Sequence, residues 1–493
     1  MQGKGLLHFA EGERAAALGR IDMRYQAKLG QFFTPAPTAE FIALMAKLPS
    51  KGVLRVLDPG AGSGMLSAAL VARILRERSE LKVDIMAIEC DSTIVPHLEA
   101  TLCECEAAGQ GRVTTQVIQA DFIFDSTGLA PRLDLENRFD LVIENPPYGK
   151  LGTSSPYRKA LRATGIDIPN LYAAFLSLSV AALKQHGQLV AITPRSFFNG
   201  PYFSAFRSQF LNSLALKRIH VFDSRATLFA DADVLQENVI LSGTRNGIQD
   251  QVKLSISRDH TDKVQARTVP YNDVVFPNDP HKFIRLNTHE EDTATAEFVL
   301  SLPCTLADLG IQVSTGRVVD FRSRHALSDV ELPGTSPLVY PGNLRNGRIA
   351  WPRTIRKPQW FNPLNPKDHK LLMPEGWYTV VKRFTSKEES RRIVASSWSP
   401  AEYPGPVAFE NHLNVFHANG RGLDKDLAKG LALWLNSSLI ENFFRTFSGH
   451  TQVNATDLRS FRFPELAALR DLGRTETMTQ NELDRLVMKR VSK

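Results

Sequence analysis

Residues 53–64 read VLRVLDPGAGSG, an apolar run followed by an acid and three alternating glycines. The run at residues 53–57 is typical of a buried strand, and residues 66–76 have the pattern of a helix. Glycines permit a tight turn and let the backbone approach a ligand closely, where a Cβ would obstruct it. The stretch therefore predicts the first strand, loop and helix of a doubly wound α/β domain that binds a ligand at the loop.

Further apolar stretches that are typical of strands follow at residues 83–88, 113–118, 139–143 and 188–192. Helical patterns separate them, notably at residues 93–108 and 171–185. Strands of nearly continuous apolar character that alternate with helices indicate a mostly parallel sheet covered on both faces. Ahead of this pattern, residues 11–48 are expected to form two helices around a loop at residues 30–35.

Composition and charge exclude several classes of protein. No apolar run approaches the ~20 residues of a membrane-spanning helix, and no secretory signal is evident, so we expect a cytoplasmic protein. The four cysteines are too few and too irregularly spaced for a disulfide framework or a zinc site, so no metal is expected. The formal net charge of +7 favours an anionic partner.

Acidic side chains follow the first three predicted strands, at Asp58, Glu89 and Asp121. Because the carboxyl ends of parallel strands meet at one edge of a sheet, these acids predict a single binding site. A carboxylate at Asp58 would repel a pyrophosphate but suits the amino group of a methionine moiety. Glu89 could bond a ribose diol, and Asp121 with Phe122 could bind an adenine ring, so the set favours S-adenosylmethionine. Any one of these acids could instead be a solvated loop residue, and the glycine loop alone also fits a nicotinamide cofactor.

The segment Asn145-Pro146-Pro147-Tyr148 follows the fourth predicted strand and carries the predicted chemistry. An exocyclic amine conjugated into a ring is a poor nucleophile because its lone pair is delocalised. The Asn145 side-chain oxygen and the Pro146 carbonyl could accept its hydrogens and favour the pyramidal nitrogen that attacks a methyl group. Tyr148 offers a face on which a base could stack. A rigid turn is the alternative for such a segment taken alone.

Three segments in this order, GQFFTP at 30–35, DPGAGSG at 58–64 and NPPY at 145–148, resemble the gamma class of N6-adenine DNA methyltransferases, the TaqI-like group of restriction–modification systems. The resemblance covers most of the chain, and the order of the motifs is as specific as the motifs. It implies S-adenosylmethionine as cofactor, duplex DNA as substrate and extrusion of the target adenine. It also assigns the segment around Phe33 to the methionine end of the cofactor. The predicted cofactor contacts are then Phe33, Thr34, Asp58, Gly60, Gly62, Glu89, Cys90, Asp121 and Phe122.

Three C-terminal segments, at residues 381–389, 410–414 and 448–454, resemble the target-recognition domains of the BsuBI/PstI-like subgroup. Members of this subgroup read six-base palindromes such as CTGCAG. Family members also carry an aromatic residue beyond the fifth strand that stacks on the flipped adenine. The sequence has no clear match near residues 237–241, and Phe222 and Phe229 are the candidates. No endonuclease signature is evident, so a cognate restriction endonuclease would act separately.

A basic segment lies in the C-terminal part, where residues 341–400 hold 12 Lys or Arg against 4 Asp or Glu. Phosphate neutralisation requires such a cluster, although a solvated surface patch would show the same count. Amide side chains that could reach base edges are Asn343, Asn411, Asn414 and Gln452, and loop capping is the alternative for each. The predicted phosphate contacts are Arg345, Arg348, Arg353, Lys382, Arg383, Arg391 and Arg392.

The length of 493 residues exceeds what one hydrophobic core usually supports, so several domains are expected. The pattern predicts a catalytic methyltransferase domain at residues 1–245 and a connecting segment at 246–300. An α+β target-recognition domain at 301–470, with one long apolar helix at 427–447, is expected next. Residues 471–493 are expected to form a charged tail, of which residues 482–493 fray.

Other functions remain open on the sequence. A cytosine C5-methyltransferase would need Cys304 and the string at residues 237–239 in the opposite chain order, so these matches are treated as coincidence. The Asn-Pro-Pro-Tyr chemistry also serves methylation of adenine in RNA and of glutamine amides in proteins, although those substrates need a large recognition domain less. An inactive DNA-binding specificity subunit is disfavoured by the intact Asn145 and glycine loop.

Overall fold

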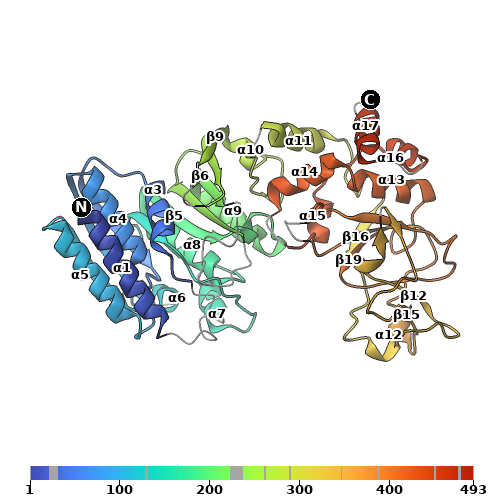
Figure 1. The fold of residues 1–493 in the computed structure, drawn as a ribbon, viewed down its shortest axis with the longest axis horizontal. Coiled ribbons are helices and arrows are strands. Elements are labelled where there is room, and N and C mark those ends of the chain that lie inside the picture. The colour runs from blue at the N-terminus through green and yellow to red at the C-terminus, as the bar shows by residue number, and fades with distance from the viewer. Residues whose placement is uncertain are drawn as a thin grey trace. The chain divides into compact units, whose positions relative to one another are not determined.

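The computed structural model describes residues 2–20, 32–127, 131–163, 165–222, 237–259, 262–287, 290–345, 347–385, 389–448, 451–475 and 479–491. The chain forms two compact units, Met1–Thr288 and His289–Lys493, called here the first and second unit (Figure 1). The expected connecting segment at residues 246–300 forms no unit of its own and is divided between the two. Among the described residues, no helix combines the length and apolar character needed to cross a bilayer.

The first unit is built on a nine-stranded sheet in the order β3-β2-β1-β4-β5-β7-β6-β8-β9. The strands from β3 to β5 pair in parallel, which confirms the predicted mostly parallel sheet. Because the strand order turns between β1 and β4, a crevice opens at the carboxyl ends of these strands. The bounds are β1 (Lys51–Pro59), β2 (Glu80–Glu89), β3 (Val113–Gln119), β4 (Phe139–Glu144) and β5 (Leu183–Pro194).

Helices cover both faces of this sheet, because neighbouring residues of each buried strand point to opposite sides. Val56 and Leu141 belong to one core, whereas Leu57 and Val142 belong to the other. One face carries α1 (Gln2–Leu18), α3 (Ala36–Met45), α4 (Met65–Glu77) and α5 (Val95–Gly109). The other face carries α6 (Phe122–Ser126), α7 (Pro156–Ala163), α8 (Leu171–Ala182), α9 (Ser204–Ser213) and α10 (Tyr271–Val274).

The far edge of the sheet includes part of the segment that was expected to be irregular. Strand β7 is antiparallel to β5 and β6, β8 is parallel to β6, and β9 closes the edge antiparallel to β8. In β8 the alternate residues Val252 and Leu254 are buried, a period of two that the alternation of polar and apolar residues in the sequence already carries. The bounds are β6 (Leu214–Phe222), β7 (Asn238–Arg245), β8 (Gln251–Ser257) and β9 (Gln265–Pro270).

The second unit is α+β, with a six-stranded sheet, β10-β19-β16-β17-β14-β13, and a four-stranded sheet, β11-β15-β12-β18. The strands are β10 (Gln312–Thr315), β11 (Leu327–Ser328), β12 (Ser336–Val339), β13 (Leu344–Arg345), β14 (Arg348–Ile349), β15 (Trp360–Phe361), β16 (Tyr378–Lys382), β17 (Ala395–Trp398), β18 (Ala408–Phe409) and β19 (Leu413–His417). The helices are α11 (Glu290–Ser301), α12 (Pro366–His369), α13 (Lys425–Leu435), α14 (Ser438–Phe447), α15 (Ala455–Arg459), α16 (Leu466–Gly473) and α17 (Gln480–Val491).

Two helical expectations in the second unit were wrong. The single helix expected at residues 427–447 is broken into α13 and α14, because Asn436 exchanges side-chain hydrogen bonds with the Ala395 backbone and Ser437 caps α14. The part of the tail expected to fray, residues 482–493, lies largely in α17, in which Leu483 and Val487 are buried on one helical face.

Candidate active site

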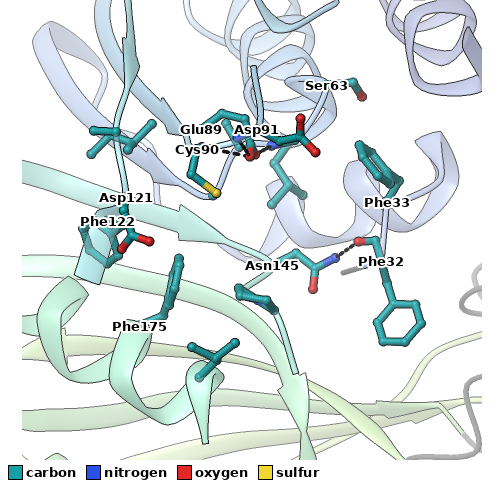
Figure 2. A pocket seen from close by; sticks show the side chains of 18 of the residues that line it. Phe32, Phe33, Ser63, Glu89, Cys90, Asp91, Asp121, Phe122, Asn145 and Phe175 are labelled. Carbon is teal, nitrogen blue, oxygen red and sulfur yellow. Dashed lines mark hydrogen bonds between the residues drawn. The ribbon is translucent and has the colours of Figure 1, made fainter. Parts of the chain in front are cut away.

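A cavity of about 540 Å³ opens at the carboxyl ends of β1 to β4, in the size range of small-molecule sites (Figure 2). Of the residues predicted to catalyse, Asn145 and Pro147 line it, whereas Pro146 and Tyr148 are buried and are not among its lining residues. The predicted cofactor contacts that line it are Phe33, Thr34, Gly60, Gly62, Glu89, Cys90, Asp121 and Phe122.

The glycine loop adopts backbone angles that favour glycine, with φ of +67° at Gly60 and +58° at Gly62. A Cβ at Gly60 would lie 3.1 Å from the Phe175 ring, and one at Gly62 would lie 3.2 Å from the Phe33 ring. The loop therefore combines the tight turn that the sequence predicted with close packing of its backbone against Phe33 and Phe175.

Glu89 joins this loop to the end of β2 by hydrogen bonds. Its side chain is buried, and its Oε2 accepts a hydrogen bond of 3.0 Å from the Gly62 N–H. Its Oε1 accepts bonds of 2.9 Å from the N–H groups of Cys90 and Asp91 (Figure 2). Burial raises the pKa of Glu89, and the three N–H donors oppose that rise. Asp91, which also lines the cavity, was missed in the sequence because Glu89 already supplied the expected acid at this strand end.

Asp58 lies beneath the loop and is not a lining residue of the cavity. It is 1% exposed, and its Oδ2 accepts a 2.7 Å bond from the Ser67 hydroxyl. Among the described residues, its Oδ1 has no hydrogen-bond partner. Burial raises the pKa of Asp58 to about 7. A buried carboxylate oxygen without a donor is costly, so this position favours a cationic or hydrogen-bonding ligand group.

Asp121 is already bonded on both oxygens. Its Oδ1 caps α6 by accepting from the N–H groups of Ile123 and Phe124, and its Oδ2 accepts a 2.7 Å bond from the Tyr157 hydroxyl. The Tyr157 ring stacks on Phe124, with ring centroids 4.4 Å apart. A ligand amine at Asp121 must therefore share Oδ2 with Tyr157 or displace that hydroxyl. Tyr157 comes from α7, beyond the predicted motifs, and no sequence signal pointed to it.

The apolar wall of the cavity pairs one predicted residue with one that the sequence did not indicate. The rings of Phe122 and Phe175 lie 4.9 Å apart, tilted by 52° (Figure 2). Phe175 belongs to the buried helix α8, where an apolar residue predicts only core packing. The two tilted rings provide an apolar surface against which a planar ligand group can pack.

Asn145 has a side-chain amide with a fixed orientation. Its Nδ2 donates to the Phe32 carbonyl at 2.8 Å and to the Thr34 hydroxyl at 2.9 Å, and the first of these bonds is drawn in Figure 2. Its Oδ1 accepts a longer bond of 3.3 Å from the Tyr148 hydroxyl. Because acceptors hold both amide hydrogens, the oxygen is the group that Asn145 can offer to a substrate.

Tyr148 is buried in this structure, with 5% of its surface exposed. Phe32 packs against it at 5.4 Å between ring centroids, and Tyr172 approaches it edge-on at 6.3 Å. Phe222 is excluded as a stacking residue, because it is buried against Phe41 in the core of the sheet. Phe229 lies outside the described residues, as do positions 30 and 31 of the first motif.

The predicted DNA contacts fall into exposed and internal groups. Arg345 and Arg348 are exposed and face each other across the β13–β14 hairpin. Arg353 donates to the Gly342 carbonyl, Lys382 pairs with Glu389 at 2.7 Å, and Arg383 donates to the Asn411 carbonyl. Asn411 and Gln452 are partly buried.

Other predicted contacts hold the second unit together. Arg391 donates to the carbonyls of Asn436 and Ser437 at the end of α13. Arg392 is 2% exposed and bonds the hydroxyls of Thr385 and Ser448. A role in base reading was wrong for Asn343 and Asn414, because both are fully buried and bond the backbone.

The sheet order and the cavity between the glycine loop and the Asn145 loop define a Rossmann-like methyltransferase core. The family described as Eco57I restriction-modification methylase matches residues 82–229. The chain is 40% identical to the type II methyltransferase M.BsuBI of Bacillus subtilis over 94% of each chain. It is 41% identical to M.PstI of Providencia stuartii over 93% of this chain and 92% of that one.

The solved structure of the type IIL restriction–modification enzyme MmeI has the same fold, with a TM-score of 0.59 and 13% identity over 89% of this chain and 70% of that one. From the similarity to M.BsuBI and M.PstI, the chain belongs to the type II methyltransferases of restriction–modification systems. This confirms the resemblance on which the sequence prediction relied.

The buried carboxyl of Asp58 predicts a pH-dependent stability. Its pKa is about 7 in the folded chain, against about 4 when unfolded. The folded state therefore binds a proton that the unfolded state releases, so the free energy of unfolding falls as pH rises from about 4 to about 7. Asp58→Asn should be more stable than the wild type at pH 8 by about 2–4 kcal/mol, and the two should converge near pH 4. Denaturant unfolding without added cofactor measures this difference.

Glu144 contributes to the same fall in the free energy of unfolding, because burial raises its pKa to about 8. It is present in the wild type and in Asp58→Asn alike, so it does not change the difference between them. Asp84→Asn is the matched control, since Asp84 is an exposed acid on the neighbouring strand β2 and should keep the wild-type pH dependence. If Asp58→Asn follows the wild-type curve at every pH, the buried Asp58 is not the source of the dependence.

Proposed function

We propose that this chain transfers a methyl group from S-adenosylmethionine to N6 of an extruded adenine in duplex DNA, as the modification enzyme of a restriction–modification system. The observation that carries the proposal is the oriented Asn145 amide at the wall of a cavity shaped for a small ligand. S-adenosylmethionine supplies an electrophilic methyl group on a sulfonium. The rest of the reaction consists of positioning and charge stabilisation by this chain.

The residues around the cavity fit that cofactor. Phe33 and Thr34 in the lining suit the methionine end, and the buried, unpartnered Oδ1 of Asp58 would have to become accessible to bond its amino group. Asp91 is a half-buried acid beside Glu89 that lines the cavity, and it can bond a ribose hydroxyl while Glu89 holds the loop. The apolar wall of Phe122 and Phe175 suits the cofactor's adenine ring, with Asp121 at its edge. Cys90 and the loop glycines complete the lining.

The target amine would meet two fixed acceptors. Asn145 Oδ1 and the Pro146 carbonyl would each accept one of its hydrogens, which localises the nitrogen lone pair for in-line attack. Both acceptors belong to a rigid loop, since Pro146 and Pro147 restrict the backbone on either side. Extruding the adenine costs a few kcal/mol, and stacking on Tyr148 would offset part of this cost. Because Phe32 now packs against Tyr148, its ring must move for a base to enter.

The second unit would hold the DNA. The relatives of this chain are type II methyltransferases that match it across both units, which supports a recognition role for residues 289–493. The exposed Arg345 and Arg348 would contact phosphates, as would Arg353, Lys382 and Arg383. We propose CTGCAG as the target sequence and a cognate endonuclease that acts as a separate protein. A unit of this size would be superfluous for a protein amide or a short RNA, which disfavours these substrates.

The substrate assignment predicts one product. The wild-type chain with S-adenosylmethionine should produce N6-methyladenine in duplexes that contain CTGCAG and in no permuted duplex. Mass spectrometry of the nucleosides identifies the methylated base. Matched single-stranded RNA and a cell protein extract should remain unmethylated. Methylcytosine in the DNA, or methylation of the RNA or protein alone, would contradict the proposal.

The catalytic assignment predicts that Asn145→Ala lowers the rate of methyl transfer by about 10²–10³-fold, because one fixed acceptor at the reacting nitrogen is lost. Cofactor affinity, measured by calorimetry, should fall far less than the rate, although the variant also loses the bonds that hold residues 32–34 at the cavity wall. Asn212→Ala, an exposed asparagine on α9, is the matched control and should keep the full rate. A rate within tenfold of the wild type would show that Asn145 is not the acceptor.

The phosphate assignment predicts a change in salt dependence. Arg345→Ala should reduce the slope of log K against log salt for duplex binding by about 1, because one fewer counterion is released. Lys51→Ala is the control, since Lys51 is exposed at the amino end of β1, away from the carboxyl edge. Fluorescence anisotropy at several salt concentrations measures the slopes. Equal slopes for the wild type and Arg345→Ala would remove Arg345 from the phosphate contacts.

A further inference from the structure

Three segments that are distant in the sequence meet in one hydrogen-bonded framework of the second unit. The Arg383 N–H donates to the His412 carbonyl at 2.9 Å, and the Val453 N–H donates to the Arg383 carbonyl at 2.7 Å. The backbones of Phe384 and Gln452 also form an antiparallel bridge. The side chains of Arg383, Phe384, His412 and Gln452, called here the reading cluster, are thus carried by backbones that brace one another.

The His412 side chain is oriented by a buried acid, Glu410. Glu410 is 1% exposed, and its Oε1 lies 2.6 Å from His412 Nδ1 while its Oε2 accepts from the His412 N–H at 2.9 Å. The His412 side chain itself is 47% exposed. A carboxylate partner favours a proton on Nδ1, so Nε2 is the nitrogen available to a ligand. A buried carboxylate is costly unless bonded, and both of its oxygens here bond this one exposed residue.

Phe384 supplies an apolar surface beside the His412 ring. Its side chain is 37% exposed, and its ring centroid lies 4.8 Å from that of His412. The Arg383 guanidinium lies 5.5 Å from the Phe384 ring, and its Nη1 is bonded to the Asn411 carbonyl. This arrangement leaves the apolar ring of Phe384 in water, with a cation on it and an oriented imidazole beside it. It therefore contributes little to the packing of the unit.

We propose that Phe384 and His412 determine sequence specificity by contacting base edges in the major groove of the target DNA, and that Glu410 is the positioning residue for His412. This inference rests on the proposed function. The chemistry of the cluster matches that groove: the imidazole meets the acceptors of guanine, the phenyl ring meets the thymine methyl, and glutamine pairs with adenine, while Arg383 contacts a phosphate beside them. The pre-bonded Arg383 and His412 would lose little freedom on contact, which favours discrimination between base pairs.

Duplex DNA is the occupant that the surrounding charge favours. The cluster carries the cationic Arg383 next to Lys382, and the same unit exposes Arg345 and Arg348. Base contacts alone would give too little affinity, and phosphate contacts from the same unit would supply the remainder. If the cluster bound another protein instead, its variants would alter the binding of that protein and leave the choice of DNA sequence unaltered.

The experiment compares His412→Ala and Phe384→Ala with His325→Ala as the matched control. His325 lies in the same unit, its side chain is 50% exposed, and its Nε2 lies 3.1 Å from the buried Asp368. Methylation rates are measured on the wild-type target duplex and on duplexes that each differ from it at one base pair. We expect both cluster variants to lose about 10–100-fold of discrimination at one or two positions. His325→Ala should keep the wild-type pattern.

Two further measurements separate a loss of base recognition from a loss of folding. Cofactor affinity and thermal unfolding are recorded for every variant, and Phe384→Ala decides the question if His412→Ala does not fold, because the Phe384 side chain is partly exposed. Glu410→Gln keeps an acceptor for Nδ1, so it should lose less discrimination than His412→Ala.

The outcomes are distinct. If a cluster variant methylates every duplex more slowly by the same factor, or if His325→Ala loses the same discrimination, the assignment of the reading cluster is overturned. The proposed function stays intact in either case. A wild-type chain that methylates no DNA overturns the proposed function and this inference with it.

Discussion

The whole catalytic region depends on how one amide group is bonded. Asn145 donates both of its side-chain hydrogens to the segment at residues 32–34, which comes from the opposite end of the domain sequence. These bonds place Phe33 and Thr34 on the cavity wall and, at the same time, leave the Asn145 oxygen as the only group it can offer. The wall of the cavity and the proposed acceptor for the substrate are therefore set by the same interaction, and neither can be rearranged without the other.

The parts of the first unit that could be predicted follow from local rules. Continuous apolar runs identified β1 to β5, and the rule that parallel strands share a carboxyl edge brought Asp58, Glu89 and Asp121 together. What a side chain bonds to could not be predicted. Asp58 lies under the loop rather than in the cavity lining, and Tyr157 and Phe175 reach the site from helices whose sequences indicate only packing.

In the second unit, counting charges located the basic segment but could not distinguish its arginines. An arginine carries five N–H donors, so it satisfies helix ends and buried hydroxyls as readily as phosphates. Arg391 and Arg392 do this, while Arg345 and Arg348 remain exposed on a hairpin. Strands of two to five residues add to the difficulty, because so short a run shows no period. The long-range bridges that join residues 383–385 to 412 and 451–453 leave no local trace in the sequence either.

The distribution of charge also explains why the net charge was a weak guide. The proposed methyl donor is a cation and the proposed substrate is a polyanion, so one chain must attract opposite charges at different places. The cavity is lined by the acids Glu89, Asp91 and Asp121 together with Arg20, and Asp58 lies beneath it, whereas a local basic excess of 12 against 4 lies at residues 341–400 of the second unit. At physiological salt, charges more than about 8 Å apart are largely screened, so each region acts on its own ligand. A net charge of +7 sums these two opposed fields and describes neither.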